Sequence, residues 1–494
     1  MELEKRNKFY TLVNEMINKI SYRKINEKCG IFGIYAPDKK VSEIIFYGLQ
    51  ALQHRGQESA GIAVSDGENI LIFKDLGLVS QVFNEQNIAP LQGHIGIGHT
   101  RYSTKGMNIW SNSQPLYRMF KNESFAIVHN GNLINVNEIR SEQIKKGIRF
   151  ETTTDTEIIA SLIESSEKEN IEDAIKEATS RVKGSYSLLI LTRDKIFGIR
   201  DPYGFRPLVL GNLDGNYVIA SETCALDIID AVSVREIDPG EMVVLDENGM
   251  RSQMVLPVER ISMCVFELIY FARPDSYIHN KNMFEVRHRM GQELAKESPA
   301  NADIVISVPD SGTPAAIGYS AESKIPYAEG FIKNRYVGRT FIQPVQEIRE
   351  IGVRLKLNPL KEVIKGKRLV VVDDSIVRGN TSKKIIKMLY CAGAREVHMR
   401  ISSPPLLHPC YYGIDMATEK EFIANHKTLE DIRKSLNVDS LKYLTIEGLI
   451  KAVGESKEKF CFACFNGEYP VHIPENIESD KYSIDKEEKV SSNA

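Results

Sequence analysis

The sequence predicts two domains: an α+β domain with an antiparallel core over residues 29–256, and an α/β domain with a parallel sheet over residues 257–473. A chain of 494 residues has room for two or three domains. In the first part, short apolar runs such as GIAV, FAIV and SLLIL lie between glycine and polar turns, a pattern typical of antiparallel strands. In the second, ADIVISV and RLVVVDD are each followed by a loop and a helix, which indicates a parallel, doubly wound sheet.

Two helices are expected against the antiparallel core, from the amphipathic segments DTEIIASLIESS and IEDAIKEATSRV. The ends of the chain differ from both domains. Residues 1–28 form a polar leader with apolar residues at helical spacing, and its acidic residues do not fit a transit peptide. Residues 474–494 are polar and charged, so we expect a disordered tail.

Composition limits the classes of function. The 63 basic and 66 acidic residues nearly cancel and no long basic block occurs, which argues against binding to nucleic acid or a membrane surface. No apolar run approaches the roughly 18 to 20 residues of a membrane span, and no secretory signal is present, so a cytoplasmic location is expected. In that reducing compartment the seven cysteines are expected to be catalytic, metal-binding or part of the core.

A phosphate-binding pattern occurs in RLVVVDDSIVRGNTS. Two adjacent acids, Asp373 and Asp374, end a strand, and a loop rich in hydroxyl and glycine residues leads into a helix. Such a loop can direct backbone N–H groups at a phosphate, and carboxylate oxygens suit Mg²⁺. The alternative is a strand end with solvated acids, which the flanking apolar run and RGNTS disfavour. The segment resembles the phosphoribosyl-pyrophosphate motif of type I phosphoribosyltransferases.

This resemblance implies that Asp373 and Asp374 hold the ribose hydroxyls and Mg²⁺. The residues implied to wrap the 5′-phosphate are Ser375, Arg378, Gly379, Asn380, Thr381 and Ser382. The earlier VPDSGTP matches the pyrophosphate loop, with Asp310 and Gly312 at the ligand and Ser311 at the metal. The basic segment KNRYVGRTFIQP, with Lys333, Arg335 and Arg339, could close over the pyrophosphate leaving group. Its alternative is a solvated surface loop.

Cys29 lies in the stretch NEKCGIFGIYA, and motifs further along the chain suit attack of its thiol on an amide. In HNGN, the side chain of Asn130 and the N–H of Gly131 could both donate to one oxyanion. Arg101 could bind a carboxylate in bidentate fashion, and Asp155 could hold an ammonium group. Such a set suits an α-amino acid amide, which is glutamine.

The catalytic base is not evident from these motifs. His129 beside Asn130 could act as one, although a histidine next to a tight turn is as often structural. The alternative is the α-amino group of Cys29, whose ordinary pKa near 8 suits a base at neutral pH. That group is free only if residues 1–28 are removed.

The motifs CGIFGIYA, LQHRGQESAGIA, GHTRYST, HNGNL and TDTE together resemble the glutaminase domain of the N-terminal-nucleophile hydrolases, which implies an αββα sandwich. With the phosphoribosyltransferase segment after it, the chain resembles the amidophosphoribosyltransferase family from Cys29 to about Ile473. The resemblance implies Cys29 as nucleophile, Asn130 and Gly131 as oxyanion hole, Arg101 and Asp155 as glutamine clamps, and residues 1–28 as a propeptide. It also implies conversion of phosphoribosyl pyrophosphate, glutamine and water to 5-phosphoribosylamine, glutamate and pyrophosphate, with ammonia passing inside the protein.

Four of the cysteines form a possible metal site. Cys461 and Cys464, in CFAC, have a chelating spacing, and Cys264 and Cys410 would complete a four-sulfur set. Spacing alone does not separate zinc from an iron–sulfur cluster, and a core without metal is the alternative. The propeptide-bearing branch of the family implies a [4Fe–4S] cluster that fastens the C-terminal segment to the transferase domain. The helical or core contexts of Cys224 and Cys391 suggest no chemistry for them.

Relatives suggest a homotetramer under feedback inhibition by purine nucleotides, for which Arg335, Arg354 and Lys356 are candidates from charge and position. Two other functions compete. A non-catalytic nucleotide-sensing regulator could use the same transferase fold. A glutaminase without a second activity is the other alternative, and it would give VVVDDSIVRGNTS no function.

Overall fold

The computed structural model describes residues 29–102, 108–258, 260–334, 357–414 and 419–474. These residues form two compact units, which are described separately. The sandwich unit contains the described residues between 29 and 283, 408–414 and 456–474. The parallel-sheet unit contains those between 284 and 407 and 419–455. The division falls later than the predicted boundary at residue 256, and two C-terminal segments join the sandwich unit.

The sandwich unit is built on two antiparallel sheets. Among the described residues, one has the strand order β11-β9-β10-β1-β4-β2-β3 and the other the order β13-β12-β8-β7-β6-β5. The strands of the first are β1 (Gly30–Tyr35), β2 (Ser59–Ser65), β3 (Ile70–Leu76), β4 (Ile95–Arg101), β9 (Val209–Leu213), β10 (Asn216–Ala220) and β11 (Val232–Glu236). Those of the second are β5 (Leu116–Phe120), β6 (Glu123–Leu133), β7 (Gly184–Leu191), β8 (Ile196–Arg200), β12 (Glu241–Asp246) and β13 (Gly249–Met254).

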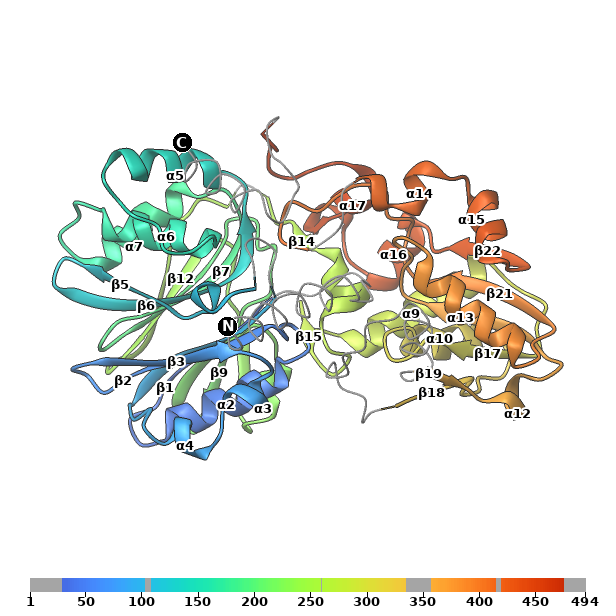
Figure 1. Cartoon of the computed structure of the whole chain (residues 1–494), viewed down its shortest axis with the longest axis horizontal. Helices are drawn as coiled ribbons and strands as arrows, with labels where there is room; N and C mark the ends of the chain where they lie inside the picture. Colours follow the sequence, from blue (N-terminus) through green and yellow to red (C-terminus); the bar gives the residue numbers. More distant parts are fainter. Residues whose placement is uncertain (1–28, 103–107, 259, 335–356, 415–418, 475–494) are drawn as a thin grey trace, which may run out of the picture. The chain divides into compact units, whose positions relative to one another are not determined.

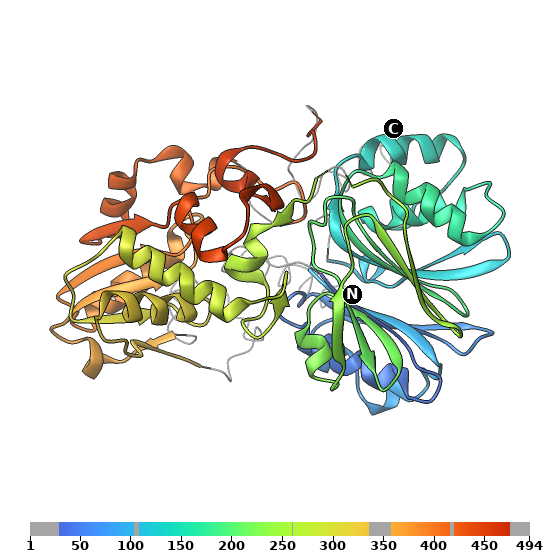
Figure 2. The same ribbon diagram turned by 180° about the vertical axis from the view of Figure 1, so that it is seen from behind.

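Helices cover the outer face of each sheet, which gives the αββα order of layers (Figures 1 and 2). The first sheet carries α2 (Val41–Ala51), with the short helices α3 (Val79–Val82), α4 (Glu85–Ile88) and α8 (Cys224–Asp227). The second carries α5 (Val136–Lys145), α6 (Asp155–Glu164) and α7 (Ile171–Arg181). The last two are the helices predicted from DTEIIASLIESS and IEDAIKEATSRV, so that prediction is confirmed.

Alternation along β1 shows how the sequence produces these layers. Ile31 packs between the two sheets, whereas Phe32 and Ile34 pack with the helices on the outer face. Side chains of a strand point to opposite faces in turn, so a strand covered on both sides is apolar throughout. A Cβ at Gly48 on α2 would lie 2.4 Å from the ring of Phe32, so this glycine allows the helix to lie close to the sheet.

The HNGN motif lies within a strand and forms no tight turn. Asn130 stands opposite Ser187, and Gly131 opposite Tyr186, in the pairing of β6 with β7. A Cβ at Gly131 would lie 2.0 Å from the carbonyl oxygen of Ser185. The glycine that resembled a turn signal is therefore required by the close approach of the neighbouring strand.

The parallel-sheet unit confirms the second predicted architecture. Its main sheet has the order β17-β20-β21-β22 among the described residues, and each neighbouring pair is parallel. These strands are β17 (Ile304–Ser307), β20 (Arg368–Asp373), β21 (Glu396–Ile401) and β22 (Ser440–Tyr443). The helices are α9 (Met283–Glu297), α10 (Thr313–Ser323), α12 (Lys361–Ile364), α13 (Asn380–Cys391), α14 (Ile423–His426), α15 (Leu429–Leu436) and α16 (Ile446–Val453). A separate pair is formed by β18 (Phe331–Lys333) and β19 (Leu357–Pro359).

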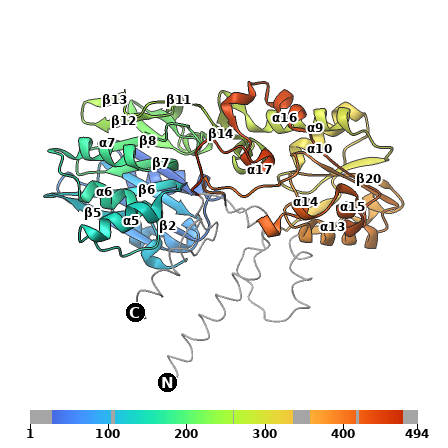
Figure 3. The same ribbon diagram turned by 90° about the horizontal axis from the view of Figure 1, so that it is seen from above.

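The connections of this sheet diverge between β17 and β20. After β17 the chain runs through α10 to Tyr327, which bridges Val305 on the edge of β17 away from β20. After β20 it runs through α13 to β21 on the other side. Right-handed connections then place the two helices on opposite faces, and Figure 3 shows α10 and α13 on either side of β20. This divergence is the topological switch point, where open α/β sheets bind ligands.

Two C-terminal segments return to the sandwich unit. The strand β23 (Phe460–Cys461) pairs in parallel with β14 (Met263–Cys264), and α17 (Ala463–Asn466) follows it. A turn of π-helix spans Glu267–Phe271, and β15 (Tyr277–Ile278) pairs with β16 (Lys281–Asn282). No helix among the described residues is both long and apolar enough to cross a membrane.

Candidate active site

Cys29 lies directly before β1, at the end of the first sheet where Gly30 pairs with Thr100 on β4. Its side chain is 8% exposed, and Sγ lies 3.5 Å from the carbonyl oxygen of Tyr102. Its own carbonyl oxygen accepts a hydrogen bond of 3.2 Å from Nε of Arg55. The residue predicted as nucleophile is therefore held at a buried strand end from both its side chain and its main chain.

The surroundings of Cys29 keep its thiol protonated. Burial raises the pKa of the thiol to about 11, and the positive charge of Arg101 only partly opposes this. The negative charges of Asp155 and Glu58 raise the pKa further. Since the thiolate is the nucleophilic form, this thiol needs a base before it can attack a substrate at neutral pH.

The two predicted glutamine clamps lie near Cys29, because both act on the pKa of its thiol. Arg101 is buried at the end of β4, with Nη1 3.9 Å from Oε2 of Glu58. Asp155 begins α6, and its Oδ2 accepts a hydrogen bond of 3.0 Å from the N–H of Leu133. A cation and an anion thus lie near the thiol, and these two charges would complement the carboxylate and the ammonium group of an α-amino acid.

Asn130 is the residue whose side chain was predicted to form part of the oxyanion hole. It lies on β6, the strand that Asp155 contacts at Leu133, and its side chain is completely buried. Neither Nδ2 nor Oδ1 has a hydrogen-bond partner among the described residues. A buried amide without partners costs roughly 1–3 kcal/mol. The side-chain Nδ2–H group of Asn130 is thus available to a ligand oxygen, which is what an oxyanion hole requires.

The ring of His129 contacts residues of α6 and β7. Its Nδ1 lies 3.3 Å from Oγ1 of Thr156 and 3.5 Å from Oδ1 of Asp155, and its Nε2 lies 3.4 Å from the carbonyl oxygen of Ser185. The imidazole is thus engaged with α6 and β7, and this geometry favours a structural part for the residue.

In the parallel-sheet unit, Asp373 and Asp374 lie at the carboxyl end of β20, at the switch point. Their side chains are only 2% and 1% exposed. Oδ1 of Asp373 accepts a hydrogen bond of 3.0 Å from the N–H of Asp374, while the carboxylate of Asp374 accepts from the hydroxyls of Ser311 and Ser375. The two predicted loops therefore meet through Ser311 and Asp374, and their oxygen atoms form a donor set that suits Mg²⁺.

The VPDSGTP loop is fitted closely to this strand end. A Cβ at Gly312, the residue before α10, would lie 2.6 Å from the carbonyl oxygen of Val372 and 3.3 Å from Cα of Asp373. The close approach that this glycine allows is thus to β20, whereas the sequence suggested an approach to the ligand. Asp310 forms an exposed ion pair with Lys333, which brings together two residues predicted to bind phosphoribosyl pyrophosphate.

The second loop leads into α13 through Gly379, whose φ of +76° is a left-handed conformation that glycine adopts without strain. No side chain among the described residues caps this helix. Asn380, Thr381 and Ser382 form its first turn, where backbone N–H groups favour an anion. Arg378, just before it, forms an ion pair with Glu421.

The four cysteines of the predicted metal site all belong to the sandwich unit. Cys264, Cys461 and Cys464 are buried and Cys410 is partly buried. Burial raises the pKa of each thiol, that of Cys264 to about 12, and mutual electrostatic effects link all four. Among the described residues, no three histidine, cysteine, aspartate or glutamate side chains are arranged to hold a metal ion. The set fits an iron–sulfur cluster in its donor chemistry and seclusion, without preformed coordination geometry.

This placement also changes the expected structural effect of a cluster. A group bound by these thiols would fasten the C-terminal segment to the sandwich unit, whereas the sequence suggested the transferase domain. The physical reason is the pairing of β14 with β23, which joins residues almost 200 positions apart. The remaining two cysteines differ in exposure. Cys224 is buried, whereas Cys391 is exposed at the end of α13.

Several predicted features lie outside the described residues. They are the leader at residues 1–28, the tail from residue 475, and, within the basic segment and its surroundings, Arg335, Arg339, Arg354 and Lys356.

Comparison with known proteins agrees with both halves of this geometry. Residues 99–227 match the family described as "Glutamine amidotransferase domain", and residues 275–402 match that described as "Phosphoribosyl transferase domain". The amidophosphoribosyltransferase of Synechococcus elongatus is 52% identical over 465 residues, which cover 93% of this chain and 94% of that protein. The chain belongs to the amidophosphoribosyltransferase family.

Other amidophosphoribosyltransferases support this assignment. That of Methanothermobacter thermautotrophicus is 48% identical over 457 residues, covering 92% of this chain and 96% of the relative. Among solved structures, the glutamine phosphoribosylpyrophosphate amidotransferase of B. subtilis, in complex with ADP and GMP, is 46% identical with a TM-score of 0.86. The alignment covers 91% of this chain and 99% of the B. subtilis chain. A structure described as the allosteric regulatory enzyme of purine biosynthesis is also 46% identical, with a TM-score of 0.87 and coverages of 91% and 97%.

Proposed function

We propose that the chain converts phosphoribosyl pyrophosphate, glutamine and water to 5-phosphoribosylamine, glutamate and pyrophosphate, the first committed step of de novo purine (IMP) synthesis. The observation that carries the proposal is the buried, unpartnered amide of Asn130 on the strand that Asp155 contacts, together with the placement of Arg101 and Asp155 near Cys29. The same chain holds two buried carboxylates at the switch point of a parallel sheet, which supports a second, phosphoribosyl-binding site.

The first half of the reaction releases ammonia from glutamine. Arg101 binds the α-carboxylate of the substrate and Asp155 its α-ammonium group. Sγ of Cys29 then attacks the side-chain amide carbon, and the developing oxyanion accepts hydrogen bonds from Nδ2 of Asn130 and the N–H of Gly131. Ammonia leaves as the C–N bond breaks, and water releases glutamate from the thioester. Removing one such donor typically lowers kcat about 10²- to 10³-fold.

The base in this step is the α-amino group of Cys29. A thiol with a pKa of about 11 must transfer its proton before attack, and a group with an ordinary pKa near 8 can accept it at neutral pH. This requires cleavage between Lys28 and Cys29, so residues 1–28 act as a propeptide. Intact-mass measurement of the native enzyme tests this. A fully active chain that still begins at Met1 would refute it and return His129 as a candidate.

The second half takes place at the switch point of the parallel-sheet unit. Asp373 and Asp374 bind the ribose hydroxyls and, with Ser311, would hold Mg²⁺, whose charge would stabilise the pyrophosphate leaving group. The 5′-phosphate binds at the start of α13, between Ser375 and Ser382. Ammonia attacks C1 of the ribose, and the bond from C1 to the pyrophosphate oxygen breaks. Direct transfer of ammonia between the sites keeps it unprotonated, and the segment around Arg335 would help to enclose it.

A [4Fe–4S] cluster bound by Cys264, Cys410, Cys461 and Cys464 would have a structural role. Four secluded thiols that lie close enough to affect one another electrostatically support it, because sulfur ligands are what such a cluster binds. Protein purified without oxygen should contain about four irons per chain and absorb broadly in the visible range. Stoichiometric zinc in place of iron would refute the cluster.

Regulation and assembly follow the family. Purine nucleotides would act as feedback inhibitors of a cytoplasmic homotetramer, and the B. subtilis relative is described in complex with ADP and GMP.

One assay separates this function from its rivals. Glutamate and pyrophosphate release are measured with both substrates, and with each one omitted. Equal amounts of both products, dependent on both substrates, are expected. Glutamate release alone would indicate a bare glutaminase, and release of neither product would favour a nucleotide-sensing regulator.

A further inference from the structure

Arg55, in the LQHRGQES motif, has no part in the reaction described above. It is buried, and its Nε donates the 3.2 Å hydrogen bond to the carbonyl oxygen of Cys29. Arg55 therefore fixes the main chain of the nucleophile, and its own position decides where the nucleophile lies.

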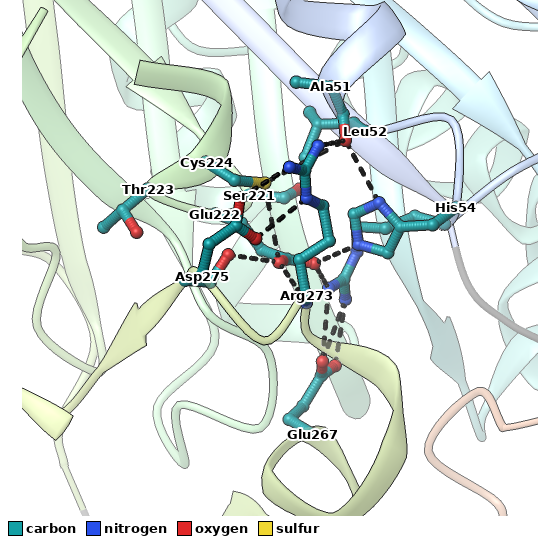
Figure 4. A network of polar contacts seen from close by, with 12 residues as sticks. Ala51, Leu52, His54, Ser221, Glu222, Thr223, Cys224, Glu267, Arg273 and Asp275 are labelled. Carbon is teal, nitrogen blue, oxygen red and sulfur yellow. Dashed lines mark hydrogen bonds and ion pairs between the residues drawn. The ribbon is translucent and has the colours of Figure 1, made fainter. Parts of the chain in front are cut away.

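Two buried carboxylates set the position of Arg55. Its Nη2 donates to Oε1 of Glu267 at 2.9 Å, its Nη1 lies 3.2 Å from Oε2 of the same carboxylate, and Nη1 also binds Glu222. Figure 4 shows Glu222 and Glu267 reaching this network from different segments of the chain. Glu222 also accepts from His54 at 2.8 Å and from Ser276 at 2.6 Å, so it anchors the local chain.

Glu267 also contacts a second arginine, Arg206. Its Oε1 also accepts a 2.9 Å hydrogen bond from Nη1 of Arg206, and both side chains are completely buried. Nη2 of Arg206 donates to the carbonyl oxygen of Tyr412 at 2.7 Å. One carboxylate thus joins the arginine that holds Cys29 to an arginine that holds the segment after Cys410.

Arg206 faces the four-cysteine site. Its positive charge lowers the pKa of the thiols of Cys264, Cys410 and Cys461 against the larger effect of burial. The N–H of Cys264 donates at 3.1 Å to the carbonyl oxygen of Phe205, the neighbour of Arg206. Nε of Arg206 is buried and has no hydrogen-bond partner within the part of the chain that the structure describes.

We propose that Arg206, Glu267 and Arg55 are positioning residues that couple occupancy of the four-cysteine site to the placement of the nucleophile. The inference rests on the proposed function and deepens it. A group bound by the four thiols would hold the segment after Cys410, and with it the carbonyl oxygen of Tyr412 that Arg206 binds. Arg206 orients Glu267, and Glu267 keeps Arg55 on the carbonyl oxygen of Cys29. When the site is empty this segment is held less firmly, and the nucleophile is less well aligned.

The first test replaces the bridging carboxylate by its uncharged isostere, Glu267→Gln, in the iron-loaded enzyme. Glutamine hydrolysis should fall about 10- to 100-fold in kcat, the size of effect expected for a displaced reacting group. KM for glutamine should stay within about twofold, because Arg101 and Asp155 are untouched. Activity with ammonia in place of glutamine should be unchanged, and Glu267→Asp should recover part of the lost kcat.

The matched control is Glu241→Gln. Glu241, on β12, is also a buried carboxylate, and it pairs with Arg235 on β11. It accepts a further hydrogen bond from the N–H of Asp238, away from the Arg55 network. It should lower the melting temperature to a similar extent as Glu267→Gln without the selective loss of kcat. If the two variants lose glutamine and ammonia activities alike, Glu267 is only structural and the proposal is refuted.

The second test measures the coupling in the other direction, as linkage requires. Cys29 is alkylated with an electrophilic glutamine analogue, and visible absorption gives the chelator concentration that removes half of the iron at equilibrium. Alkylation should raise this concentration at least about threefold in the wild type and leave it unchanged in Glu267→Gln. An equal rise in both proteins would overturn the proposed coupling. A wild type without iron would instead refute the proposed cluster, and one without glutamine-dependent activity would refute the proposed function itself.

Discussion

Replacement of Asn130 by alanine should separate activity from stability. Most substitutions of a fully buried polar residue break hydrogen bonds and destabilise the fold. Asn130 is 0% exposed, yet neither polar atom of its side chain has a partner among the described residues. Asn130→Ala therefore removes an uncompensated amide, and the main loss should be the donor to the oxyanion.

The two magnitudes can be estimated independently. Relief of an unsatisfied buried polar group is worth about 1–3 kcal/mol, and loss of packing around the missing atoms costs a comparable amount. The free energy of unfolding should thus change by less than about 1 kcal/mol. Loss of one oxyanion donor should lower kcat for glutamine hydrolysis about 10²- to 10³-fold, equivalent to about 3–4 kcal/mol of transition-state stabilisation.

Asn112 supplies the control. It is equally buried, but its Nδ2 donates to Oγ1 of Thr153 at 3.0 Å and its Oδ1 accepts from the N–H of Thr153 at 3.0 Å. Asn112→Ala should lower the free energy of unfolding by about 1–3 kcal/mol. Denaturant titration and steady-state kinetics with glutamine or ammonia give both quantities. The reasoning is refuted if Asn130→Ala is destabilised as much as Asn112→Ala, or if its glutamine hydrolysis survives.

Two further predictions concern Cys29 and Gly312. In a chain that retains residues 1–28, alkylation of Cys29 by iodoacetamide should increase about tenfold per pH unit up to a midpoint near pH 11, because burial raises the pKa of the thiol to about 11. Since this pKa lies above that of the same thiol in the unfolded chain, the free energy of unfolding should decrease from about pH 9 upwards. An alkylation midpoint at about pH 8.5 would contradict both expectations. Gly312→Ala would place a Cβ 2.6 Å from the carbonyl oxygen of Val372. It should cost about 1–3 kcal/mol of stability and suppress pyrophosphate release while glutamate release continues; unchanged pyrophosphate release would exclude this loop from the site.

The sequence predicted the elements whose apolar patterns are local. Strands β6 and β20, and helices α6 and α7, follow from the local runs FAIV, RLVVVDD, DTEIIASLIESS and IEDAIKEATSRV, and the structure contains all of them. It also predicted that Arg101 and Asp155 lie near Cys29, because their charges complement those of one substrate. Their roles in binding and catalysis stay predictions until the variants are measured.

Features that depend on contacts distant in sequence could not be predicted in the same way. The pairing of β14 with β23 moves the cysteine segments to the sandwich unit, and no local pattern indicates it. HNGN resembled a turn because glycine commonly marks one, whereas Gly131 is fitted against the carbonyl oxygen of Ser185. A faint signal for the charged network did exist: Glu267 is the single charged residue in the apolar run CVFELIYF.

That network poses an energetic question that its proposed role answers. Arg55, Arg206, Glu222 and Glu267 are all at most 1% exposed, and their formal charges cancel. Burying such pairs removes four charges from water, and well-packed apolar residues of similar volume often give equal or greater stability. Stability alone is therefore a weak reason for the arrangement. Charge-assisted hydrogen bonds have a property that an apolar core lacks, because they fix the direction of their partners as well as the distance. In this network they connect the carbonyl oxygen of Tyr412, two residues after Cys410, to the carbonyl oxygen of Cys29.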